Sequence, residues 1–387
     1  MSGSLRKGFL SGTHRLVSPE ATLERISPHL RDFGITRCAD ITGLDCIGIP
    51  VYVAVRPQGR VLQTANGKGL RHVDAVVSAH MESIEQWHAE NPAVPFRRAS
   101  LSELRRSGAP FVPPRTLEGF AGAAHLGATV VLDWVEGEDL LSGEPIWIPA
   151  FAGYYYRHQH FTYSFNGLAS GNHVIEARLH GLYELIERDT LARLSAAGQV
   201  HLEDCDVIEL ASPMPTDAGD PVASLVEMIR RAGLELFLLR APSRLPTHTF
   251  MAVLIDPSPF GHASTVNFGA GAHLSPTVAA TRAITEAAQS RLTFIHGSRE
   301  DLTEEAYRGG SGHTELLSFF HDLAADTSWG SLDDLSSDDL ATDYERVLAG
   351  LRDLGVKGVY AVDLSRPELP VSVVKTLIPG AQCPSWI

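Results

Sequence analysis

The chain of 387 residues is poor in cysteine, in clustered positive charge and in long apolar runs. Its four cysteines, at positions 38, 46, 205 and 383, form neither a CxxC pair nor a disulfide framework, which predicts a reducing, cytoplasmic location. No run of about 18 apolar residues indicates a membrane span, and the first residues lack the apolar core of a signal peptide. The net charge of −14 argues against a nucleic acid ligand, because phosphate binding depends on clustered Lys and Arg.

One stretch concentrates acidic side chains on an expected helix. Residues 170–189 read SGNHVIEARLHGLYELIERD, with apolar side chains at helical spacing on one side. At 100° per residue, Glu176 and Glu187 lie about 20° apart around the axis, and Glu184 lies one turn before Glu187. Like charges on one face are destabilising unless cations neutralise them, and carboxylate oxygens suit Mg²⁺. The pattern predicts a magnesium site, and a solvated acidic helix is the alternative.

Two further expected helices carry narrow polar stripes. The first covers residues 74–90, and the second opens with Ser275 as N-cap and Pro276 at the first helical position. Each places three polar side chains at i, i+4 and i+7: Ser78, Glu82 and Glu85 in the first, Arg282, Glu286 and Gln289 in the second. Carboxylates can hold a metal while Arg, Ser and Gln contact phosphate oxygens, so three such helices together indicate a nucleotide triphosphate site.

These stripes carry a family resemblance. SxxxExxE from Ser78, NxxxE with ExxER from Asn172 to Arg188, and RAxTExxQ from Arg282 to Gln289 resemble the YcaO family of ATP-dependent peptide-modifying enzymes. Three further segments support the match: GTHRLVSPEATLERI near the N-terminus, GITRCADITGLDCIGIPV at 34–51 and NGKG at 66–69. NGKG itself is no Walker motif, since the Ser or Thr after Lys and the upstream glycine are missing.

The resemblance implies ATP and Mg²⁺ as cofactors and assigns roles to individual positions. Five glutamates match Mg²⁺ ligands that bridge the ATP phosphates: Glu82, Glu85, Glu176, Glu184 and Glu187. Seven residues match positions that contact the nucleotide or order the surrounding shell: Arg15, Thr22, Ser78, Asn172, Arg188, Arg282 and Gln289. At Arg15 the chain has Arg where other members have Lys. No catalytic base or nucleophile is identified.

The chemistry implied is phosphorylation of a backbone amide oxygen. A nucleophile adds to the carbonyl carbon, and the resulting oxyanion attacks the γ-phosphate of ATP, which converts the oxygen into a phosphate leaving group. Both partners of that attack are negative, so catalysis depends on charge neutralisation and in-line positioning. A Cys, Ser or Thr nucleophile of the substrate gives an azoline, a sulfide source gives a thioamide, and an amine gives an amidine.

The GTHR and GITR segments and the IPGAQCPSWI ending resemble YcaO members that act with a TfuA-type partner in peptide thioamidation, whereas azoline-forming members generally end in PxPxP. We therefore expect thioamide formation in a ribosomally made peptide or protein, with a TfuA-like partner and a homodimeric enzyme. An azoline-forming cyclodehydratase is an alternative. A noncatalytic ATP-binding accessory protein, and a metal-dependent hydrolase or kinase acting on a small molecule, are further hypotheses.

The expected fold is α+β, with mixed or antiparallel sheets covered by helices in two-layer subdomains, as in YcaO proteins. Strand candidates begin at Val51, Ala128, Leu234, Thr247 and Val359, several with period-two alternation. Residues 1–60 are expected to contribute to the nucleotide site, and residues 61–387 to form the YcaO-type ATP-binding catalytic domain, as one intertwined unit.

Three other features have simpler interpretations. His158 and His160 form an HxH pair that could bind a transition metal, although a packed strand or loop explains it equally well. His180, one turn before Glu184, is either packed or a partner of the metal ligands. The acidic run at 333–345 is interpreted as a solvated loop followed by a helix start.

Overall fold

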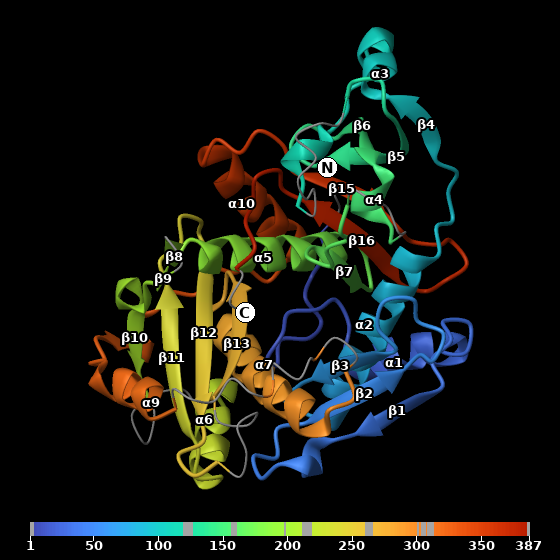
Figure 1. Ribbon diagram of the computed structural model, residues 1–387. Helices are drawn as coiled ribbons and strands as arrows, with labels where there is room; N and C mark the ends of the chain where they lie inside the picture. The colour runs from blue at the N-terminus through green and yellow to red at the C-terminus, as the bar shows by residue number, and fades with distance from the viewer. Residues whose placement is uncertain are drawn as a thin grey trace.

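The computed structural model describes residues 4–118, 127–155, 161–196, 199–210, 219–259, 266–299, 302, 307 and 313–384. Over these ranges the chain forms three main β-sheets with helices packed against them (Figure 1). Nearly all strand pairs are antiparallel, and β10 with β14 is parallel, so the expected α+β fold of mixed and antiparallel sheets is confirmed.

The first sheet belongs to the N-terminal part of the chain. Its antiparallel order is β1 (Arg37–Asp40), β2 (Val51–Val55) and β3 (Thr64–Lys68). Helix α2 (His72–Glu90) packs on β2 and β3, and α1 (Pro19–Ile26) packs on α2. Ile84 and His88 are fully buried on α2, as expected for its core stripe, while Val77 and Met81 are half-buried.

The second sheet has the order β13-β12-β11-β10-β14. Its strands are β13 (Val266–His273), β12 (His248–Ile255), β11 (Glu235–Ala241), β10 (Asp206–Glu209) and β14 (Thr327–Ser328). Helices α6 (Pro221–Arg231) and α7 (Pro276–His296) cover one face; the opposite face packs against Leu191 at the end of α5 and Phe320 of α9 (His313–Asp322). Because both faces are covered, β12 is buried along its whole length.

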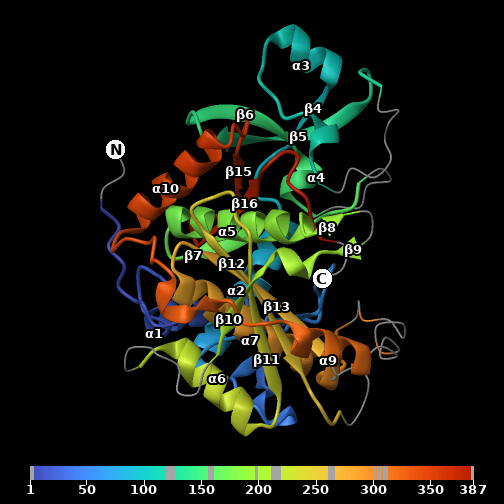
Figure 2. The same ribbon diagram turned by 90° about the vertical axis from the view of Figure 1, so that its left-hand side faces the viewer.

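The third sheet has the order β4-β5-β15-β16-β7, with β6 paired to the other side of β5. Its strands are β4 (Arg97–Ser100), β5 (Val131–Asp139), β6 (Glu144–Pro149), β7 (Leu168–Gly171), β15 (Tyr360–Asp363) and β16 (Ser372–Leu377). Figure 2 shows α5 (Val174–Ala192) lying between this sheet and the second one. The remaining elements are α3 (Leu101–Ser107), α4 (Ala150–Gly153), α10 (Leu340–Asp353) and the short pair β8 (Ser195–Ala196) and β9 (Gln199–Val200).

Each of the three polar-striped helices follows directly on a strand that contains a glycine facing it. A Cβ on Gly67 of β3 would lie 2.0 Å from the Ala79 nitrogen of α2. On β13, a Cβ at Gly271 would lie 2.2 Å from the Ala279 carbonyl oxygen of α7, and a Cβ at Gly171 of β7 would lie 2.9 Å from the Ala177 nitrogen in the first turn of α5. Glycine therefore allows strand and helix to touch. NGKG at 66–69 is a packing motif at this point.

One sequence interpretation needs correction, and another is confirmed in position but not in its hydrogen bond. Asp343, in the acidic run, is fully buried and its carboxylate lies 2.7 Å from Lys7 Nζ, so this part of the run is not solvated; the predicted helix start is correct, since α10 begins at Leu340. Ser275 is the N-cap residue of α7 and Pro276 is its first residue, as predicted, but the Ser275 hydroxyl donates to Asp334 at 2.7 Å and makes no capping hydrogen bond to the helix.

The described residues leave the histidine pair untested and test the absence of a membrane span only in part. His158 and His160 lie outside the described residues, so the HxH pair stays a prediction. No helix within the described ranges combines the length and the apolar character that a bilayer span requires.

Candidate functional site

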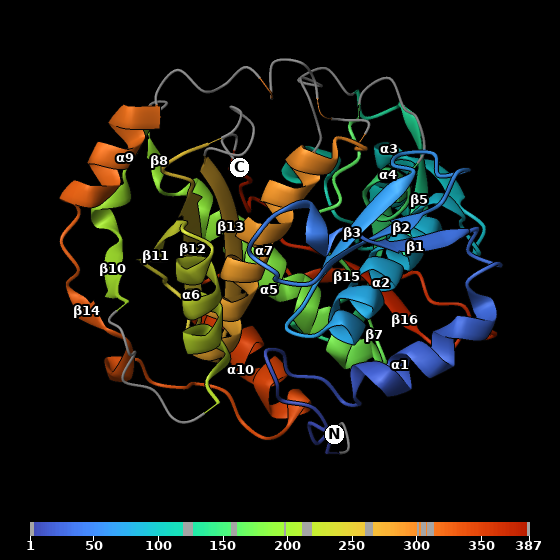
Figure 3. The ribbon, with the colours of Figure 1, turned by 90° about the horizontal axis from the view of Figure 1, so that it is seen from below.

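The three polar-striped helices meet. Helix α7 packs on both β13 and β3 and so lies between the first two sheets (Figure 3). Helix α5 contacts β13 and β7, and α2 contacts β7. Five glutamates from these helices influence one another electrostatically, and we call them the carboxylate cluster: Glu82 and Glu85 of α2, Glu184 and Glu187 of α5, and Glu286 of α7.

Glu82 and Glu85, the α2 members of the cluster, are half-buried, and few neighbouring groups stabilise their ionised forms. Burial raises the pKa of Glu82 to about 7, although Lys68 opposes this shift, and the Glu184 and Glu286 carboxylates raise it further. Burial likewise raises the pKa of Glu85 to about 8, and the Ser170 hydroxyl, which donates to Glu85 Oε1 at 2.6 Å, opposes it. Both shifts mean that ionising these groups is costly without a cation nearby.

The α5 members are oriented by backbone N–H groups. Gly167 N donates to Glu184 Oε2 at 2.9 Å, and Ala272 N donates to Glu187 Oε2 at 3.1 Å. Burial raises the pKa of Glu187 to about 7, and Arg188, whose Nε lies 3.5 Å from Glu187 Oε1, opposes the shift. In both residues one carboxylate oxygen is held by the backbone.

Glu286 differs from the other members because cations surround it. Lys68 Nζ lies 2.7 Å from Glu286 Oε2, and Arg188 Nη2 lies 3.9 Å from Oε1. Burial alone would raise the pKa of Glu286, but Lys68 and Arg188 hold it at about 2. Lys68 and Glu286 were not among the predicted site residues. The signals were present in the NGKG segment and the α7 stripe, but only the fold brings β3 and α7 together.

Glu176 binds the N-terminal segment through hydrogen bonds. It is 2% exposed and accepts hydrogen bonds from Leu16 N at 2.8 Å and Asn172 N at 3.0 Å. The Asn172 side chain donates to the Thr22 hydroxyl at 3.0 Å. The fold therefore joins Thr22, Asn172 and Glu176 in one network, although 150 residues separate Thr22 from Asn172.

Two arginines and a histidine line a small cavity together with Glu176. The cavity is lined by Arg15, Glu176, His180 and Arg282, among others. Burial lowers the pKa of Arg15, and Glu176 partly offsets this. Burial also holds the pKa of His180 well below its usual value, so its ring is neutral and its Nδ1 lies 3.3 Å from Arg282 Nη1. His180 thus contacts a predicted nucleotide residue from its place on α5.

The remaining two predicted residues lie on the same helices with fewer contacts. Ser78 of α2 and Gln289 of α7 are half-buried. Within the described part of the chain, neither side chain makes a hydrogen bond to another predicted site residue. Both positions lie one to two turns from cluster members on their own helices, so proximity along the helix is what associates them with the site.

The residues present fit Mg²⁺ that arrives with a nucleotide. In the described ranges, no three His, Cys, Asp or Glu side chains are arranged to hold a metal ion by themselves. Mg²⁺ typically uses one or two carboxylates and completes its octahedron with substrate phosphates and water. The Nε atoms of Arg188 and Arg282 are buried without a hydrogen-bond partner in these same ranges, and guanidinium donors suit phosphate oxygens.

The family assignment follows from comparison with known proteins. Residues 66–382 match the YcaO cyclodehydratase family, described as binding ATP and Mg²⁺. An uncharacterized protein of Mycobacterium tuberculosis is 37% identical over 95% of this chain and 82% of its own length. An uncharacterized protein in the tfuA 3′ region of Rhizobium leguminosarum bv. trifolii is 33% identical over 99% of this chain and 92% of its own length. The chain belongs to the YcaO family, and ATP and Mg²⁺ are that family's cofactors.

Solved structures show the same fold. YcaO from Methanopyrus kandleri, bound with AMPPCP and Mg²⁺, has a TM-score of 0.75 and 23% identity, covering 97% of this chain and 95% of its own. A heterocyclase in complex with substrate and cofactor has a TM-score of 0.80 and 23% identity. That match covers 99% of this chain but 54% of the heterocyclase, so this chain spans about half of it.

Proposed function

We propose that this protein uses ATP and Mg²⁺ to phosphorylate the oxygen of a backbone amide in a ribosomally made peptide or protein. The carboxylate cluster is the observation that carries the proposal. Glu82, Glu85 and Glu187 all have pKa values raised by burial, and a cation would stabilise their ionised forms. Membership in a family of ATP- and Mg²⁺-binding cyclodehydratases supports this use of the cluster.

The proposed roles are those that the resemblance to YcaO enzymes implies for these positions. Five glutamates would hold Mg²⁺ against the triphosphate: Glu82, Glu85, Glu176, Glu184 and Glu187. Seven residues would contact the nucleotide or order its surroundings: Arg15, Thr22, Ser78, Asn172, Arg188, Arg282 and Gln289. The N-terminal segment of residues 1–60 thus contributes to the site as part of one unit with residues 61–387. Mg²⁺, when bound, would neutralise the phosphates and the attacking oxyanion.

Thioamide formation with a TfuA-like partner is the reaction that we propose for the activated amide. A sulfide adds to the carbonyl carbon, the oxyanion displaces ADP from the γ-phosphate, and phosphate leaves as the S–H proton is lost and the C=S bond forms. The genomic position named for the Rhizobium relative, beside tfuA, supports this reaction. The family's description as cyclodehydratases and the heterocyclase fold favour azoline formation as a second candidate.

Calorimetric titration with ATP, with and without Mg²⁺, tests the nucleotide site. Wild type should bind ATP only with Mg²⁺, and Glu187→Ala should weaken binding by at least about 100-fold, because a buried metal ligand is lost. Glu345→Ala removes an exposed acid from α10 and serves as the matched control, with affinity unchanged. ATP binding by Glu187→Ala at wild-type affinity would rule out the assigned site. Mass spectrometry of a peptide product then separates oxygen-to-sulfur exchange from loss of water.

A further inference from the structure

Strand β16 carries a cation that is almost fully buried. Lys375 is 2% exposed and follows Val373 and Val374, which are fully buried. An ammonium group loses its hydration when buried, which costs several kcal/mol unless other groups solvate it. An apolar side chain would fill the same space without that cost. The position of Lys375 therefore calls for an explanation beyond packing.

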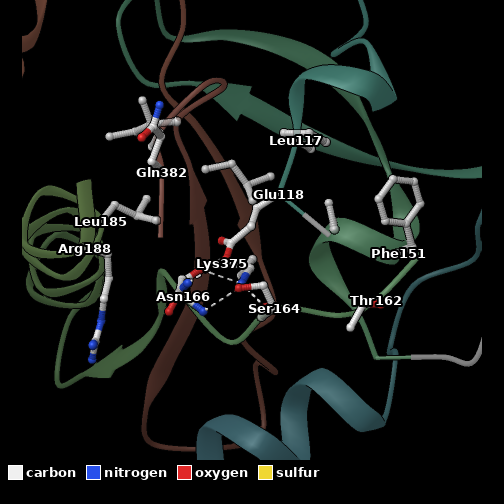
Figure 4. Close-up of a pocket in the computed structure, with 14 residues that line it drawn as sticks. Leu117, Glu118, Phe151, Thr162, Ser164, Asn166, Leu185, Arg188, Lys375 and Gln382 are labelled. Atoms are coloured by element: carbon white, nitrogen blue, oxygen red, sulfur yellow. Dashed lines mark hydrogen bonds between the residues drawn. The ribbon is translucent and has the colours of Figure 1, made fainter. Parts of the chain in front are cut away.

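Backbone carbonyl groups solvate this ammonium. Lys375 Nζ donates to the carbonyl oxygens of Ser164 and Asn166, the latter at 2.6 Å (Figure 4), and lies 5.1 Å from the centroid of the Tyr163 ring. Burial lowers the pKa of Lys375 to about 8, against the opposing influence of the Glu184 and Glu118 carboxylates. The side chain is thus still mostly charged at neutral pH, and it binds the segment 164–166 from inside the protein.

The next residue of that segment contacts the carboxylate cluster. Gly167 has a φ of +79°, which favours glycine, and a Cβ there would lie 2.4 Å from the Thr376 carbonyl oxygen. The Gly167 carbonyl accepts from Thr376 N at 2.8 Å and from the Thr376 hydroxyl at 3.0 Å. Its N–H donates to Glu184 Oε2. Lys375 therefore binds the carbonyl of the peptide unit whose N–H orients Glu184, and Thr376, adjacent on β16, binds the carbonyl of the next peptide unit.

We propose that Lys375 is a positioning residue that fixes Glu184 for Mg²⁺-ATP through segment 164–167. The inference rests on the proposed function, because it takes Glu184 as a ligand of nucleotide-bound Mg²⁺. Gly167 N donates to one carboxylate oxygen of Glu184, Oε2, and the Glu184 carboxylate influences Glu82 and Glu85 of the cluster electrostatically. Without the Lys375 anchor, segment 164–167 loses two hydrogen bonds, and the carboxylate loses its fixed orientation. Partners behind a metal ligand commonly change metal affinity by about 10–100-fold.

A double-mutant cycle tests the route through Glu184. ATP affinity in the presence of Mg²⁺ is measured by calorimetry for wild type, Lys375→Met, Glu184→Gln and the double variant. Lys375→Met alone should weaken binding by about 10–100-fold. In the Glu184→Gln background the same substitution should add less than about twofold, since the group it positions is already gone. Lys357→Met replaces an exposed lysine and is the matched control, with no change expected.

A structural role alone would give a different pattern. Lys375→Met would then lower thermal stability, while the folded fraction bound Mg²⁺-ATP with wild-type affinity, or the effects of the two substitutions would add; either result overturns the inference. If Lys375→Met does not fold, Thr376→Val removes only the hydroxyl that donates to Gly167 and should weaken binding several-fold. Unchanged affinity in that variant would also overturn it.

The same titrations separate this inference from the proposed function. Absence of Mg²⁺-dependent ATP binding by wild type, or wild-type affinity in Glu184→Gln, contradicts the proposed site, and the inference fails with it. Weak binding by Glu184→Gln together with normal binding by Lys375→Met contradicts the inference alone.

Discussion

Two glutamates five residues apart on α2, Glu90 fully buried and Glu85 half-buried, have opposite surroundings. Glu90 is 1% exposed and forms a bidentate pair with Arg56, at 2.6 and 2.9 Å, and it also accepts from the backbone N–H groups of Arg60 and Val61. Glu85 has the Ser170 hydroxyl as its hydrogen-bond donor and faces other carboxylates. One acid is paired with a cation within the protein, and the other has its pKa raised by burial to about 8. We therefore propose that Glu90 stabilises the fold and that Glu85, on the same helix, belongs to the nucleotide site.

The largest expected effect comes from removing the buried ion pair between Arg56 and Glu90. Arg56→Met leaves Glu90 buried without its counter-ion, which should reduce the free energy of unfolding by about 3–5 kcal/mol. Urea denaturation measures the loss. The double variant Arg56→Met with Glu90→Leu should recover most of it, since no charge then remains unpaired. A loss below about 1 kcal/mol in the single variant would show that Glu90 is solvated in some other way.

Substitution of Glu85 should affect nucleotide binding instead of the free energy of unfolding. Glu85→Gln keeps the shape and the Ser170 contact but removes the ionisable group, so ATP affinity with Mg²⁺ should fall by about 100-fold, or about 2.8 kcal/mol. The free energy of unfolding without nucleotide should change little, because the raised pKa already keeps much of Glu85 protonated at neutral pH. A large loss of stability with normal ATP affinity would assign Glu85 to the fold.

His88 lies between these two glutamates on α2, and its burial should make the stability of the protein depend on pH. Burial lowers its pKa to about 4, and its Nδ1 lies 2.8 Å from the Ile84 carbonyl. The folded state therefore binds fewer protons than the unfolded chain between pH 4 and 6.5, so stability falls as pH drops through that window. His88→Leu should reduce this acid loss by about 2 kcal/mol between pH 6.5 and 5. Urea denaturation at several pH values measures the free energy of unfolding of both proteins. An equal loss of that free energy between pH 6.5 and 5 in wild type and in His88→Leu would contradict the prediction.

The smallest effect is expected at an exposed pair, which sets the baseline. On α6, Arg231 Nε lies 2.7 Å from Glu227 Oε1, and the two side chains are 76% and 40% exposed. Arg231→Ala should change the free energy of unfolding by less than about 0.5 kcal/mol, because water and salt screen the pair. Thermal denaturation at low and high salt provides the measurement. If Arg231→Ala lost as much free energy of unfolding as Arg56→Met, burial would not explain the difference between ion pairs in this protein.

Much of the fold and of the candidate site was accessible from the sequence because its signals are local. The helix expected over 74–90 corresponds to α2 (His72–Glu90), and the strand expected from Val51 corresponds to β2 (Val51–Val55). Helical periodicity needs only neighbouring residues, so the polar stripes of α2, α5 and α7 were visible before the structure. The buried Lys7–Asp343 pair was not, since its partners lie more than 300 residues apart and an acidic run resembles a solvated surface.

The sequence by itself determined the helices, their polar faces and the resemblance to the YcaO family, which the comparisons confirmed. Only the tertiary structure decided which acids are satisfied. It surrounds Glu286 with Lys68 and Arg188, holds Glu176 with Leu16 and Asn172, and leaves Glu82, Glu85 and Glu187 with pKa values raised by burial. The physical reason is that the charge state of a buried carboxylate depends on dehydration and on partners brought close by folding, and neither is encoded in local periodicity.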